Sequence, residues 1–146
     1  MPASFELLDV DLVIARLKAQ LPALRGVHGA AGLSEAMEAF KGEPPQAYVV
    51  PISDMGSESR ANATVQRVAA GFGVVLFVRN LRDPQGEAAL AKLRPVRIAL
   101  LGALLGHQLA PGYEPIQKDR GRLLQVRDAY LVWQDDFRTA THISDV

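Results

Sequence analysis

The pattern of apolar and polar positions begins with helical spacing. Apolar residues recur every three or four positions in the first segment: Val10, Val13, Ile14, Leu17 and Leu21. This stripe predicts an amphipathic helix, which Pro22 ends. A second, shorter helix is predicted over residues 33–40, and the glycine- and proline-containing residues 41–45 break it.

The pattern then changes to that of a strand. Residues 47–52 are rich in β-branched and aromatic side chains, which favour a pleated backbone. Pro51 indicates an edge strand or the end of the strand, because proline cannot donate a ladder hydrogen bond. The polar residues 53–62 that follow predict a long mobile loop.

A longer strand region is predicted over residues 64–80. Its segment 74–78 is apolar at every position and is therefore expected to be buried on both faces. Gly71 and Gly73 indicate a bulge or a bend. Residues 83–86 predict a turn.

The main helix is predicted over residues 87–105. Pro95 is expected to kink or split this helix, because its ring cannot accept the normal helical geometry. Gly106 is suited to the position that follows a helix C-terminus. Residues 107–121 contain several prolines and glycines and predict irregular structure.

The last part of the chain predicts a hairpin. Residues 123–127 and 130–137 have the composition of strands, and residues 128–129 form a tight turn between them. Because the predicted strands are adjacent in pairs, the order of elements favours an α+β fold over a doubly wound parallel sheet. We expect a two-layer α/β arrangement in which a mostly antiparallel sheet of about four strands packs against two main helices. Residues 1–146 are expected to form a single domain.

Composition limits the classes of function. Among 146 residues there are 16 basic and 16 acidic side chains. The broad positive field that would attract a nucleic-acid backbone is therefore not expected. Cysteine is absent, which excludes disulfides, thiol catalysis and cysteine-ligated metals. The N-terminus lacks the features of a signal peptide, and the longest apolar run, residues 98–106, is about half of a membrane span. We expect a soluble protein that stays in the cell that makes it.

The candidate catalytic groups are few. The three histidines, His28, His107 and His142, are scattered and lack the spacing of a metal site. Asp135 and Asp136 are adjacent strand residues whose side chains point to opposite faces, so they cannot bind one metal together unless a bulge intervenes.

Other motifs give no chemistry either. The two aspartates are interpreted as solvated carboxylates at a strand end or as partners of Arg127 and Arg138. No phosphate-binding glycine loop and no complete dinucleotide fingerprint occurs. No catalytic residue, cofactor or metal is predicted.

The C-terminal third also carries a basic cluster. Arg120, Arg122 and Arg127 lie near Lys118 and form either a solvated hairpin rim or a polar contact surface for a partner or a neighbouring copy. Trp133 lies in the last strand region with Phe137. Tryptophan is often a core residue, but it is also enriched in the residues that dominate interfaces.

Several segments of the chain, in the order in which they occur, resemble the tail-terminator family of Mu-like phages and prophages. The C-terminal ones are residues 99–106, Pro111-Gly112, residues 121–124 and residues 133–139. The earlier ones are Arg16-Leu17, Val27, residues 45–51 and residues 72–74. The resemblance covers nearly the whole chain, and the order and spacing of its segments carry it. One departure is that residues 107–110 stand where such proteins often have Trp-x-Pro after the helix.

The resemblance implies a structural protein and not an enzyme. It implies a subunit of a closed ring, a hexamer, that caps the tail tube at its final length and stops tube polymerisation. Its partners would be further copies of itself, the tail tube protein and the head-tail connector or neck protein, with no membrane and no specific nucleic acid. Its place would be the virion tail, assembled in the bacterial host cytoplasm.

Exposed loops on rigid scaffolds commonly carry binding, so residues 53–62 are a candidate docking arm. The interaction residues expected on this basis come from that loop and from the C-terminal hairpin: Asp54, Ser57, Arg60, Arg120, Arg122, Arg127, Trp133, Phe137 and Arg138.

Two other functions remain open at this point. Another neck or tail-completion protein of a phage would share the ring but not the partner. A small enzyme or ligand-binding α/β domain would use Asp135, Asp136 and His142, and a deep polar pocket that holds these groups together would favour it.

Overall fold

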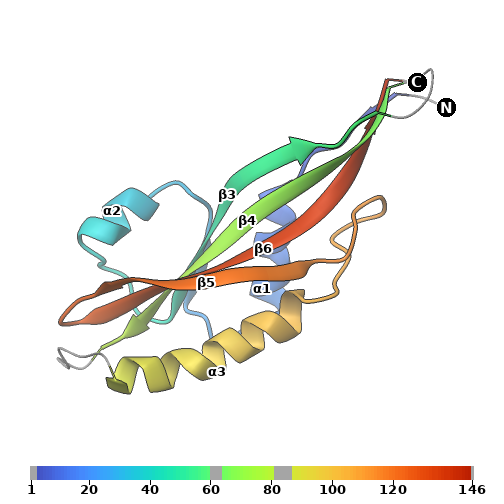
Figure 1. The fold of residues 1–146 in the computed structure, drawn as a ribbon. Coiled ribbons are helices and arrows are strands. Elements are labelled where there is room, and N and C mark those ends of the chain that lie inside the picture. The colour runs from blue at the N-terminus through green and yellow to red at the C-terminus, as the bar shows by residue number, and fades with distance from the viewer. Residues whose placement is uncertain (1–2, 60–63, 81–86, 146) are drawn as a thin grey trace.

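The computed structural model describes residues 3–59, 64–80 and 87–145 (Figure 1). The elements in chain order are β1 (Ser4–Phe5), α1 (Val10–Gln20), β2 (Gly26–His28), α2 (Leu33–Glu38), β3 (Gln46–Gly56), β4 (Val65–Arg79), α3 (Glu87–Leu104), β5 (Gln117–Val126) and β6 (Tyr130–Ser144). The predicted turn over residues 83–86 lies outside the described residues. In the described part of the chain, no helix is long and apolar enough to cross a membrane.

Six strands form one mixed, mostly antiparallel sheet in the order β1-β6-β4-β3-β2, with β5 paired to β6. The long central strands β4 and β6 pair from Val65 opposite Ser144 to Arg79 opposite Tyr130. Among the described strands, only β2 and β3 run parallel. The α+β class, the antiparallel sheet and the two main helices are therefore confirmed, and the sheet has six strands because β1 and β2 add short edges.

The two faces of the sheet carry different helices. The face that we call the α3 face carries Val74, Leu76 and Phe137, which form the main core with α1 and α3. The opposite face, the α2 face, carries Phe77 and Val132, which pack against residues of α2. We had expected residues 74–78 to be buried on both faces, and all of them are buried.

Helix α1 follows its predicted apolar stripe, with Val13 and Leu17 fully buried. Asp9 caps α1, since its carboxylate accepts a hydrogen bond of 3.0 Å from the backbone N–H of Asp11. Helix α3 continues through Pro95 to Leu104, so it is not split there. Gly106 has a φ of 75°, a left-handed conformation that glycine adopts without steric cost, as its predicted place after the helix requires.

The predicted loop over residues 53–62 is wrong for its first part. Strand β3 continues to Gly56 and pairs with β4 up to Val68. In Figure 1 the ends of β3, β4 and β6 extend beyond the helices toward the two chain termini. The polar side chains of this part of β3 lie at an exposed edge, where strand formation does not require apolar residues.

The predicted irregularity near Gly71 is confirmed, but the extra residue lies on the facing strand. The register of β3 shifts between Pro51 and Ser53, which pair with Phe72 and Gly71. The hairpin of β5 and β6 is also confirmed, although both strands are longer than predicted. β5 begins at Gln117 in what was predicted as irregular structure, and β6 continues to Ser144.

Candidate functional site

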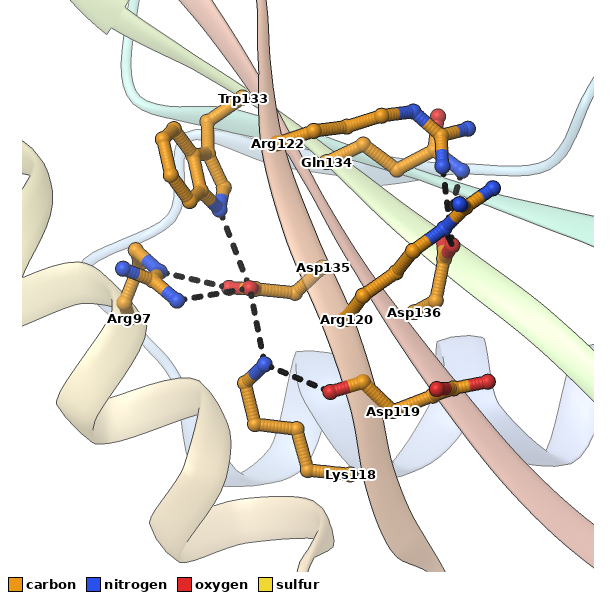
Figure 2. A network of polar contacts seen from close by, with 9 residues as sticks. All are labelled: Arg97, Lys118, Asp119, Arg120, Arg122, Trp133, Gln134, Asp135 and Asp136. Carbon is orange, nitrogen blue, oxygen red and sulfur yellow. Dashed lines mark hydrogen bonds and ion pairs between the residues drawn. The ribbon is translucent and has the colours of Figure 1, made fainter.

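The densest group of charged side chains lies on the β5–β6 hairpin and the facing helix α3 (Figure 2). Its centre is the pair Asp135 and Asp136 in β6, whose side chains point to opposite faces of the sheet, as predicted. Val74, opposite Asp135, belongs to the α3 face, and Gly73, opposite Asp136, to the α2 face. The two carboxylates therefore form two separate contact networks.

Asp135 is fully buried on the α3 face. Its carboxylate accepts two hydrogen bonds of 2.9 Å from Nε and Nη2 of Arg97 in α3, and one of 3.0 Å from Nε1 of Trp133. The ammonium of Lys118 in β5 lies 3.8 Å away. The guanidinium of Arg97 also stacks 4.4 Å above the ring centre of Trp133. This network joins α3, β5 and β6.

Asp136 is 6% exposed on the α2 face. It accepts a hydrogen bond of 2.7 Å from Nε2 of Gln134 and one of 3.1 Å from Nη1 of Arg122. Nε of Arg120 lies 3.6 Å away on a largely exposed side chain. The arginines of β5 therefore pair with Asp136, and the prediction that the two aspartates are solvated or paired with Arg127 and Arg138 is wrong.

Two glycines make room for these carboxylates. A Cβ at Gly121 would lie 2.5 Å from Oδ1 of Asp135 and 3.1 Å from Nη2 of Arg97. A Cβ at Gly73 would lie 2.6 Å from Nε2 of Gln134 and 3.1 Å from Oδ1 of Asp136. Because the side chains concerned are held by hydrogen bonds, both positions depend on the absence of a side chain.

A second, smaller ion cluster ties the segment before β5 to the sheet. Nε and Nη2 of Arg67 in β4 contact the carboxylate of Glu114 at 2.6 and 3.0 Å, and Nε2 of His142 lies 3.2 Å from it. The hydrogen bond from Arg67 lowers the pKa of Glu114. Arg67 and Glu114 line a groove of 270 Å³ together with Gln117 and Arg138.

The arrangement does not form a catalytic constellation from the residues that the enzyme alternative requires. Asp135 and Asp136 are on opposite faces, and His142 lies six positions further along β6, about 20 Å at the usual rise of a strand. Each carboxylate is occupied by donors of the fold. Within the described ranges, no three His, Asp or Glu side chains are grouped so that they could hold a metal ion.

The remaining predicted interaction residues are dispersed. Asp54 is an exposed residue of β3. Ser57 follows that strand, and its hydroxyl donates a hydrogen bond of 3.0 Å to the backbone carbonyl of Arg67. Arg127 is exposed beside the hairpin turn and donates to Gln125 at 3.3 Å. Arg138 donates to Gln117 at 3.0 and 3.3 Å. Arg60 lies outside the described residues.

The aromatic candidates are inside the subunit. Phe137 is buried in the main core and stacks on Phe72 with ring centres 5.5 Å apart, so its side chain is not accessible to a partner. Trp133 is partly buried and is held by Asp135 and Arg97. Both residues stabilise the subunit.

A model of the family described as phage tail terminator protein matches residues 3–145. The chain belongs to the phage tail terminator family. Tail terminators are structural components of the phage tail and not enzymes, and membership implies interaction with the tail tube.

Other comparisons add little to this assignment of a tail terminator. A search of curated proteins found no match. One solved structure, which carries no descriptive name, shares 16% sequence identity with the chain; the match covers 92% of this chain and 96% of that one, with a TM-score of 0.38. We base no conclusion on that likeness.

Arg97, whose side chain binds Asp135 in this tail terminator, is not among the residues predicted from the sequence. The residue lies within the apolar stripe of α3, between the buried Leu93 and Leu100. An arginine on the buried stripe of a helix requires a partner, because an unpaired buried charge is costly. The place of Arg97 between two buried leucines therefore indicated that a buried carboxylate, Asp135, lies opposite the helix.

Proposed function

We propose that this tail terminator subunit assembles into a closed hexameric ring that caps the tail tube and stops its polymerisation. The ring would also present a face to the head-tail connector or neck protein. The protein would act in the virion tail after assembly in the cytoplasm of the bacterial host. The family match over residues 3–145 is the observation that carries this proposal.

The distribution of charged groups supports an assembly role. The buried carboxylates of Asp135 and Asp136 are bound by side chains of the same subunit, and they hold α3 and β5 on the sheet. The activity of such a protein would then reside in its surfaces. A ring needs interfaces in which one surface of a copy binds a different surface of the next, so that rotation closes the assembly.

The exposed residues of the hairpin and of β3 are the proposed contact positions. Arg120, Arg127 and Arg138 are exposed on or beside the hairpin, and Asp54 is exposed on β3. Arg122 is partly exposed but also holds Asp136. Arg120 also lies 3.6 Å from Asp136. Substitutions at Arg127, Arg138 and Asp54 should therefore test contacts with partners with little effect on the fold.

The proposal is tested by tail length in phage particles. We expect that particles made without this protein have overlong tubes or tails without heads, and that the wild-type chain supplied in trans restores a uniform length. Reversal of charge at Arg127 and Arg138 together should reproduce the defect, while the purified variant keeps the thermal midpoint of the wild type. Tails of normal length and with heads in the absence of the protein would contradict the capping function.

A further inference from the structure

The sheet of this protein has an unpaired edge on each side. We propose that neighbouring copies join edge to edge, so that β3 of one copy pairs with β5 of the next. This inference rests on the proposed ring and names the two surfaces that would form its interface. The partner of each edge is thus a second copy of this chain.

The first edge belongs to β3. Strand β2 covers it only from Gln46 to Tyr48. From Val49 to Gly56, no strand in the described ranges pairs with β3 on the side away from β4. This leaves about 26 Å of strand edge at the usual rise per residue, within which Pro51 has no N–H to donate.

The second edge belongs to β5, which pairs only with β6 among the described strands. Its 10 residues correspond to at most about 33 Å, because the register with β6 shifts between Lys118 and Gly121 and between Leu123 and Gln125. The two edges are therefore similar in length. Unpaired backbone N–H and C=O groups on such edges are a template for pairing with another chain, and monomeric proteins usually protect them.

Exposed apolar side chains are present on both edges. Met55 on β3 is 75% exposed and Ile52 is 48% exposed. On β5, Leu123 is 47% exposed, and Val126 near the hairpin turn is also exposed. An edge that carries large apolar residues gains free energy when a second strand removes them from water.

The charges of the two edges are opposite. Residues 49–59 contain Asp54 and Glu58 and no basic residue. β5 contains three basic residues and one acidic residue: Lys118, Asp119, Arg120 and Arg122. Lys118 and Arg122 lie against the buried Asp135 and Asp136, so the largely exposed Arg120 is the basic side chain of β5 that is most accessible to a neighbouring copy. Complementary charge favours the contact of β3 with β5 over the contact of either edge with itself, which would bring like charges together.

The strand directions are compatible with a ring. β5, β6, β4 and β3 each run antiparallel to the next, so β3 and β5 run in opposite directions within one copy. A rotation about an axis along the strands leaves their directions unchanged. Strand β3 of one copy would then meet β5 of the next in antiparallel orientation, and the antiparallel alternation would continue through the interface.

An exposed apolar stripe on helix α3 is the alternative interface. It consists of Leu90, Ile98 and Leu105, all exposed. The stripe lacks the matching second surface that the two strand edges provide. The experiment therefore uses this helix as its control.

Cross-linking tests the edge pairing directly, since the chain has no cysteine. Four double variants combine Ile52→Cys or Met55→Cys on β3 with Arg120→Cys or Leu123→Cys on β5. Assembled protein is treated with a bis-maleimide of about 10 Å, roughly three residues along a strand. We expect at least one double variant to give a ladder of covalent oligomers, and the single variants to give none.

Charge reversal provides a second readout. Asp54→Lys or Arg120→Glu alone should raise the concentration needed for half-assembly by about tenfold or more, and the double variant should recover part of this loss. Because Arg120 also lies 3.6 Å from Asp136, the thermal midpoint of Arg120→Glu is measured too, and Asp54→Lys alone decides the test if that midpoint falls. Arg94→Glu and Ile98→Lys on α3 should leave assembly unchanged. Sedimentation velocity over a concentration series measures all five proteins.

The outcomes separate the two proposals. If the wild type assembles but no double-cysteine variant gives a ladder, the edge pairing is wrong and the ring stands. Loss of assembly in Ile98→Lys, with both edge reversals unaffected, would likewise overturn the edge pairing in favour of α3. If the wild type stays monomeric at every concentration, with tube protein present, the ring itself fails.

Discussion

Arg97 of α3, which is partly exposed, and the buried Asp135 of β6 form a two-pronged ion pair in which both hydrogen bonds are 2.9 Å long. The carboxylate has no exposed surface, and the guanidinium also stacks on Trp133. A planar guanidinium fits a carboxylate in this way with high geometric specificity. The pair fixes the position of the main helix on the sheet next to the hairpin.

Loss of Arg97 should destabilise the subunit because it leaves a buried carboxylate with fewer partners. We expect Arg97→Met to lower the free energy of unfolding by about 3 kcal/mol, the lower end of the range for a broken buried pair, since Lys118 and Trp133 still contact Asp135. The double variant Arg97→Met/Asp135→Leu should lose less than the sum of the single changes. Urea unfolding measures this, with Arg94→Met on the exposed face as the control; equal losses at positions 94 and 97 would contradict it.

The close approach at Gly121 leads to a second prediction. Gly121→Ala should destabilise by about 1–3 kcal/mol, because its Cβ would overlap the bound carboxylate of Asp135. Gly102 in α3 is the matched control, since a Cβ there meets nothing within 4 Å and alanine is favoured in a helix by about 1 kcal/mol. Thermal unfolding of the two variants should shift in opposite directions. A shift of Gly121→Ala to higher temperature would show that the site is not tightly packed.

The packing of α3 predicts that substitutions at two adjacent leucines have different effects on stability. Leu104 is fully buried in the main core, whereas Leu105 is exposed. Leu104→Ala should cost about 2–5 kcal/mol, and Leu105→Ala about 0.5 kcal/mol or less. From the sequence we would group Leu101 with Leu100 and Leu104, but Leu101 is only partly buried. Leu101→Ala should therefore cost less stability than Leu104→Ala. Denaturant midpoints of the three variants rank these positions, and equal midpoints would mean that the helix face is misassigned.

The cluster at Glu114 predicts a dependence of stability on pH. Its pKa is lowered in the folded state, first by the hydrogen bond from Arg67, so ionisation of this carboxyl stabilises the fold. That contribution is complete above the unfolded value of 4.5 and is lost as the pH falls below it toward the folded pKa. Because the pair is partly exposed, the effect should be below about 1 kcal/mol.

Urea midpoints measured between neutral and acidic pH test this contribution. Glu114→Gln should lower the midpoint at neutral pH and flatten its decline in acid. Glu38→Gln on the exposed side of α2 is the control and should leave the curve unchanged. A Glu114→Gln curve parallel to that of the wild type would contradict the role of this carboxyl.

The helices and the long strands follow from the sequence because burial imposes a period on them. Val13 and Leu17 repeat at helical spacing and are buried as that spacing requires. The same rule does not apply to the exposed end of β3, where Asp54 and Gly56 resemble a loop because no burial constrains them. We would also place Val75 and Phe77 under α3 from the sequence alone, but they face α2, because a shift of one position reverses the face of a strand residue.

The candidate site is harder to predict because its contacts are distant in sequence. Arg97 and Asp135 are 38 residues apart, and no local pattern joins them. The adjacency of Asp135 and Asp136 does predict their opposite faces, since that depends only on strand geometry. Which of the nearby arginines each carboxylate binds depends on the pairing register of β5 with β6.

Electron micrographs of tail tubes grown from purified tube protein test the central claim most directly. Addition of this protein during growth should place a ring at one end of each tube and stop its elongation at that end. Tubes that continue to grow at the same rate at both ends, without a bound ring, would contradict the account of this protein as the subunit that terminates the tail.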